Sequence, residues 1–133
     1  MSTTTDRVWR GIAITEGFDD PSVLATMHIV ATKTEQLEGE EGMGTFHFHK
    51  VEVDGADVDS VLERVSLAIK PSWFLHVISG DGSLMKVVFR GKCFSIQKGD
   101  DEALHAVIAY GKQNGVHEDQ LHLHRLFDNP YDE

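Results

Sequence analysis

Two pairs of histidines in alternating positions are the residues whose type and spacing could do chemistry. His47 and His49 alternate with phenylalanines near the middle of the chain, and His122 and His124 flank Leu123 near its end. Residues i and i+2 of a β-strand point to the same face with Cα atoms about 6.6 Å apart. Imidazole is a common ligand of zinc, copper, iron and nickel ions. We therefore expect His47, His49, His122 and His124 as a candidate site for a divalent transition metal, provided that their strands are neighbours.

Two other interpretations of these histidines stay open. Phe46 and Phe48 resemble core residues, but Val51 and Val53 share the histidine face, which predicts a strand partly buried on both sides. Histidines there can be satisfied by backbone carbonyls, water or a partner subunit, and the pattern favours this structural role. Acid–base catalysis is the third interpretation, and His76 is expected to share the same sheet face. Neither spacing matches a zinc finger or HExxH, and no nucleotide-binding or nucleophile-elbow motif occurs, so enzymatic activity is left undecided.

Alternation and turn residues predict two helices and six or seven strands. Apolar residues at helical spacing run from Val58 to Ile69 and stop before Pro71, and a second helical pattern runs from Gly99 to Asn114. The stretch 84–97 is either one strand with a bulge at Gly91 or two strands joined by a tight turn. The strands are predicted at 8–15, 26–34, 46–53, 73–78, 84–89, 93–97 and 121–127.

The order of these elements predicts a single α+β domain over residues 1–133. Residues 44–127 run strand, helix, strand, strand, helix, strand, which is the ferredoxin-like split βαββαβ order. That order predicts an antiparallel sheet with both helices on one face and with strands 46–53 and 121–127 adjacent. Residues 1–43 would add an N-terminal β-hairpin and an acidic loop, and residues 128–133 a polar tail.

Composition restricts the partners that we expect. Acidic residues outnumber basic ones 22 to 12, and a formal charge of −10 repels phosphate backbones and anionic lipids. We therefore expect neither nucleic acid nor membrane as a partner, and no apolar run approaches the ~18 residues of a membrane span. Cys93 is the one cysteine, so no intramolecular disulfide can form and a reducing, cytoplasmic location is expected. We interpret Cys93 itself as a packing residue.

The sequence has clear patterns for helices, strands and turns but no catalytic motif. This combination predicts a small cytoplasmic binding or self-associating module. An open sheet face is a natural surface for a two-fold contact, so a homodimer is expected. The alternative is a small enzyme or metal-binding protein that uses histidines on the open sheet face. As an enzyme, that alternative requires a cavity of roughly 300 Å³ beside Phe46, Phe48, Trp73 and Phe74.

Overall fold

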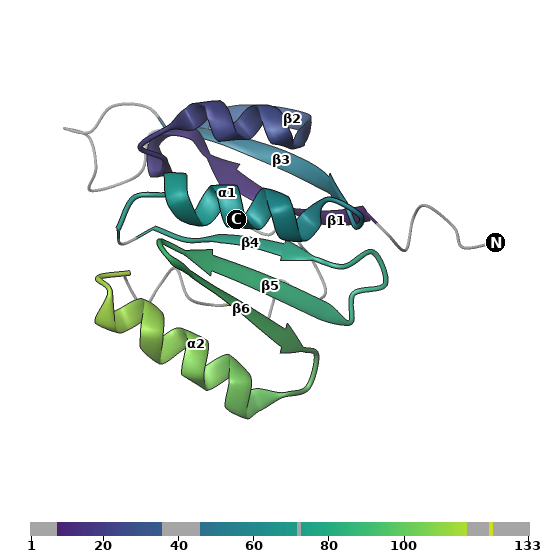
Figure 1. The fold of residues 1–133 in the computed structure, drawn as a ribbon, viewed down its shortest axis with the longest axis vertical. Coiled ribbons are helices and arrows are strands. Elements are labelled where there is room, and N and C mark those ends of the chain that lie inside the picture. Colours follow the sequence, from purple (N-terminus) through teal and green to yellow (C-terminus); the bar gives the residue numbers. More distant parts are fainter. Residues whose placement is uncertain (1–7, 36–45, 72, 117–122, 124–133) are drawn as a thin grey trace.

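In a computed structural model the chain is a mixed α+β protein built on one six-stranded antiparallel sheet (Figure 1). The structure describes residues 8–35, 46–71, 73–116 and 123. The predicted α+β class and antiparallel sheet are confirmed. The strands are β1 (Val8–Ile14), β2 (His28–Glu35), β3 (Phe46–Asp54), β4 (Leu75–Ile78), β5 (Leu84–Phe89) and β6 (Lys92–Gln97); the helices are α1 (Val58–Ala68) and α2 (Asp101–Gln113), with 3-10 helices η2 (Thr15–Gly17) and η3 (Pro21–Thr26).

The strand order, β2-β3-β1-β4-β5-β6, differs from the predicted one. β1 lies at the centre, with Gly11 opposite Val51 of β3 on one side and opposite Val77 of β4 on the other. β2 pairs with the remaining edge of β3, so β1 and β2 do not form the predicted N-terminal hairpin. The ferredoxin-like order would place β3 beside β5 and beside residues 121–127. Both edges of β3 are instead occupied by β1 and β2, because β1 inserts into the sheet rather than extending it.

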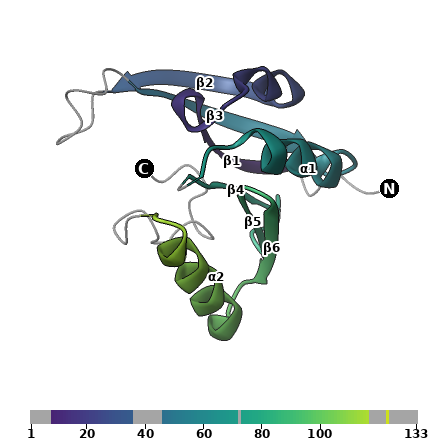
Figure 2. The ribbon, with the colours of Figure 1, turned by 60° about the vertical axis from the view of Figure 1, so that its left-hand side comes forward.

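The two α-helices lie on opposite faces of the sheet (Figure 2). Leu75 and Val77 of β4 pack in the core under α1, whereas Ile78 packs in a second core with the α2 residues Leu104 and Val107. The prediction that both helices share one face is therefore wrong. The physical reason is β4 itself, in which all four residues are buried. A strand that is buried on both sides needs a covering layer on each face.

Local signals account for the helices. The predicted apolar stripe of α1 is buried, and Ala68 is buried beside it; the members of the stripe are Val58, Val61, Leu62, Val65 and Ile69. At the start of α2, the Asp100 carboxylate accepts a hydrogen bond from the backbone N–H of Ala103 at 3.1 Å. Gly115, with φ of 87°, ends the same helix in the left-handed conformation that glycine adopts without strain. Both helices thus begin and end close to where their sequence patterns predict.

The stretch 84–97 forms two strands and not one bulged strand. Phe89 pairs with Lys92, and the connecting turn consists of Arg90 and Gly91. Gly91 has φ of 74°, a conformation that other residues rarely adopt. β4, β5 and β6 therefore form the three-stranded meander that was one of the two predicted alternatives.

Candidate functional site

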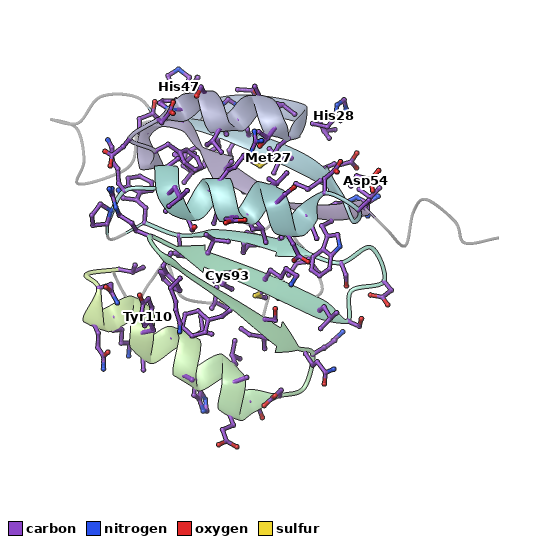
Figure 3. The ribbon with its side chains drawn as sticks, viewed as in Figure 1. Met27, His28, His47, Asp54, Cys93 and Tyr110 are labelled. Carbon is purple, nitrogen blue, oxygen red and sulfur yellow. The ribbon has the colours of Figure 1, made fainter. Side chains whose placement is uncertain are left out.

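The candidate site lies where β3 extends beyond the end of α1. Val51 and Val53 point to the α1 face and are buried there, and His47 and His49 continue along that face. Figure 3 shows His47 at one end of the β2–β3 ladder and Asp54 at the other. η2 follows β1 directly and brings its polar side chains to this end of β3. The chain thus gathers polar groups from β2, β3 and η2 at one place.

Glu16 of η2 holds His47 at two points. One carboxylate oxygen accepts a hydrogen bond from the backbone N–H of His47 at 2.7 Å, and the other lies 2.7 Å from the ring Nδ1. A carboxylate on Nδ1 favours the tautomer that carries its proton there, which leaves the lone pair on Nε2. Among the residues that the structure describes, none bonds to Nε2, and the His47 side chain is 46% exposed. Within the described part of the chain, the Nε2 atom of His47 therefore has no hydrogen-bond partner, and this nitrogen could serve as a metal ligand.

His49 has both ring nitrogens in hydrogen bonds. Its Nε2 lies 2.6 Å from the hydroxyl oxygen of Thr15, and its Nδ1 lies 2.8 Å from that of Thr32. Because a hydroxyl both donates and accepts, the two threonines can satisfy a neutral imidazole in either tautomer. His49 thus matches the structural interpretation, in which it joins η2, β2 and β3.

Two pKa values at this site are displaced from their usual ranges. Burial raises the pKa of the Glu16 carboxyl, but the hydrogen bonds from His47 outweigh it and the net pKa is lowered. Burial lowers the pKa of His49; the charge of His47 acts in the same direction and that of Glu16 opposes both. The site therefore favours an ionised Glu16 beside a neutral His49.

A β-bulge in β2 supplies Thr32 to this site. Ile29 lies opposite Val51 and Ala31 lies opposite Lys50, so Val30 is an extra residue in β2. Because side chains alternate along a strand, one extra residue exchanges the faces of all residues that follow. Regular alternation over residues 26–34 would put Ile29 and Ala31 on one face, but the bulge puts them on opposite faces. Thr32 instead faces His49, and Ala31 and Lys33 face the opposite side of the sheet.

The predicted four-histidine site is only partly within the described residues. His47 and His49 share one face of β3 as expected, and His122 and His124 lie outside the described residues. The strand adjacency that motivated the site does not occur, because β1 and β2 occupy both edges of β3. His76 does not share this face either: it lies opposite Ile12, on the α2 side of the sheet, and is 6% exposed. Within residues 8–35, 46–71, 73–116 and 123, no group of three or more His, Cys, Asp or Glu has metal-binding geometry.

The sequence interpretation missed Thr15, Glu16 and Thr32. Glu16 and His47 are 31 positions apart in the chain, and no local pattern connects them. Only the register of β1, β2 and β3 brings these groups together. A polar Thr-Glu pair directly after a strand was the available signal, but it is also typical of an ordinary turn.

Cys93 lies away from this site, on β6 beside α1. The residue is exposed. Cys93, Asp59 and Glu63 are among the residues that line a cavity of about 260 Å³ there. Partial burial raises the pKa of the Cys93 thiol, whereas the charge of Lys86 acts to lower it. A raised pKa disfavours the reactive thiolate at neutral pH.

Comparisons with known proteins give no relative for this chain: no family model, no curated protein and no solved structure matches it. None of the described helices is both long and apolar enough to cross a membrane. The functional argument therefore depends on the geometry of the chain itself.

Proposed function

We propose that the chain is a small cytoplasmic binding module that self-associates as a homodimer through β2. The observation that carries this proposal is the exposure of a whole edge strand. β2 lies at one end of the strand order, and residues 28–34 are all exposed. Ile29 and Val30 are 39% and 51% exposed, although both are large and apolar.

An exposed edge strand favours pairing with a second copy. Its outer backbone N–H and C=O groups have no strand partner among the described elements, and an identical antiparallel strand would supply one. Two-fold symmetry makes such a contact self-complementary. Lys33 and the bulge at Val30 limit the possible registers. Pairing centred on Thr32 places each Lys33 opposite Ala31 of the other copy, so that the two ammonium groups do not meet.

Light scattering coupled to size-exclusion chromatography tests this proposal. We expect a dimer for the native chain at high micromolar concentration and a monomer for a Val30→Lys, Thr34→Lys double variant. The control is Leu67→Lys, which alters an exposed apolar residue of α1 that is 73% exposed. That control should remain dimeric, and all three proteins should unfold at similar temperatures. A monomeric native chain would overturn the proposal.

Metal binding or acid–base chemistry at the histidines is the second candidate. The Glu16–His47 contact favours it, because a carboxylate on Nδ1 is the usual second partner of a metal-bound histidine. His47 would be the first ligand, with His122 and His124 as further ligands, whereas His49 would first have to break its contacts with Thr15 and Thr32.

Native mass spectrometry after incubation with Zn²⁺ or Co²⁺ tests this second candidate. His47→Gln should abolish a stoichiometric metal adduct, and His105→Gln, which alters an exposed histidine of α2, should retain it. Equal metal loading of the two variants would exclude His47 as a ligand.

A further inference from the structure

A shallow cavity of about 270 Å³ lies between β1, β2 and β3. Its principal side chains lie on the sheet face opposite α1, because Ile12 and Lys50 form a cross-strand pair on that face, as do Lys33 and Phe48. Thr32 and His49 of the histidine site also border the cavity, but the strand pairing puts their side chains on the α1 face, opposite to those of Ile12, Lys33, Phe48 and Lys50. The cavity volume lies just below the range for sites of drug-sized ligands, which is roughly 300–1,000 Å³, and so suits a smaller molecule.

The cavity is lined by apolar side chains and by two lysines. Ile12, Ala31 and Phe48 supply apolar surface, and Lys33 and Lys50 supply positive charge. Among the described residues, no acidic side chain lines the cavity, although the chain as a whole has 22 acidic and 12 basic residues. Each lysine also interacts with another group of the chain. An ammonium group carries three donors, so it can bind an anion while it keeps a contact within the chain.

The bulge at Val30 creates this combination. Without the extra residue, strict alternation from Ile29 would direct Val30 and Thr32 to the cavity face. The observed register directs Ala31 and Lys33 there instead. The small side chain of Ala31 leaves space beside Phe48, and Lys33 lies opposite Phe48. Bulges commonly re-aim side chains in this way beside binding sites.

We propose that this cavity binds a small organic anion that carries one aromatic or branched apolar group. The apolar group would lie against Phe48 and Ile12, and the anion would meet the ammonium groups of Lys33 and Lys50. Apolar contact supplies most of the burial, and the charges fix the orientation. This inference is independent of self-association, because none of its contacts requires a second copy.

NMR titration with three probes tests the proposal. Phenyl phosphate carries both a ring and an anion, inorganic phosphate only the anion, and benzyl alcohol only the ring. We expect phenyl phosphate to shift the amides of Ile12, Phe48 and Lys50 with higher affinity than either other probe. A Lys33→Gln, Lys50→Gln variant should bind phenyl phosphate about tenfold more weakly.

A Lys92→Gln, Lys98→Gln variant is the matched control, because it makes the same change in net charge outside the cavity. It should bind phenyl phosphate with native affinity. The same titration on a Thr34→Lys variant, whose change lies opposite His47 and not on the cavity face, separates this proposal from self-association, since binding is expected whether or not that protein is monomeric. Any of three results would overturn the proposal of an anion site. The first is equal affinity for phosphate and phenyl phosphate, and the second is an equal loss of affinity in the two double-lysine variants. The third is a set of amide shifts confined to residues outside the cavity.

Discussion

The Glu16 carboxylate contacts His47 at two points, the backbone N–H and the ring Nδ1, and both distances are 2.7 Å. One carboxylate thereby sets the position of the strand and the orientation of its imidazole. This contact links η2 to β3 across the chain, and the other histidine contacts lie beside it.

Replacing Glu16 should destabilise the fold in a pH-dependent way. Glu16→Ala removes both hydrogen bonds to an ionised acceptor and should cost about 1–3 kcal/mol of unfolding free energy near neutral pH. The folded-state pKa of Glu16 lies below its ordinary value of 4.5, so the unfolded chain binds the proton first. Its stabilisation is therefore present above about pH 4.5 and is lost as the pH falls through the folded-state pKa.

Thermal unfolding of the native chain and of Glu16→Gln between pH 7 and pH 3 checks this prediction. The difference in melting temperature should shrink at the acidic end. Glu63→Gln, which alters an exposed residue of α1, should show no such convergence. A constant offset for Glu16→Gln across the range would contradict the assigned role.

His49 should make the fold sensitive to mild acid. Its pKa in the folded state is lowered from 6.5, chiefly by burial, so the unfolded state binds protons more readily. The corresponding stability is present above about pH 6.5 and declines as the solution is acidified below that value. Melting between pH 8 and pH 5 should show a steeper loss for the native chain than for His49→Gln. Parallel curves for the two proteins would show that His49 is not the responsible group.

Thr32 should contribute to stability through His49, and Thr34 should not. Thr32→Val removes a hydroxyl 2.8 Å from Nδ1 and leaves that nitrogen without its partner, at a cost of about 1 kcal/mol. Thr34→Val makes the same isosteric change on the same strand and face, and its effect should be near zero. Urea unfolding of both variants, each also in a His49→Gln background, measures the coupling. An additive double variant at position 32 would contradict it.

These contacts explain which features were predictable from sequence. The helices and the six described strands were predicted to within two residues of their observed ends, because alternation, caps and turn glycines act over a few neighbouring residues. The central position of β1 was not predictable, because it depends on pairings with β3 and β4, far along the chain. The bulge at Val30 could not be predicted either, since a continuous run of β-forming residues gives no sign of where an extra residue lies. The partners of His47 and His49 depend on both of these non-local features.

Leu123 should be essential to the core beneath α2. It is fully buried in the cluster that includes Val107 and Ile96. Leu123→Ala should lower the unfolding free energy by about 2–5 kcal/mol, whereas Leu67→Ala at an exposed position should change it little. Chemical denaturation measures both. A small effect at Leu123 would mean that its side chain does not pack in this core.

Gly11 should tolerate no side chain, because two central strands approach each other there. A Cβ atom at this position would lie 1.9 Å from the carbonyl oxygen of His76, a backbone atom that cannot move without displacing β4. A Cβ at Gly17 would lie 2.6 Å from the ring of Trp73, which is a side chain. We therefore expect Gly11→Ala to abolish cooperative unfolding or lower stability by more than about 3 kcal/mol.

Gly17→Ala should fold and instead alter the fluorescence of Trp73. Gly91→Ala meets no atom within 4 Å but places alanine at φ of +74°, so it should cost only about 1 kcal/mol. If Gly11→Ala were as mild as Gly91→Ala, β1 would not lie against β4 in the register described.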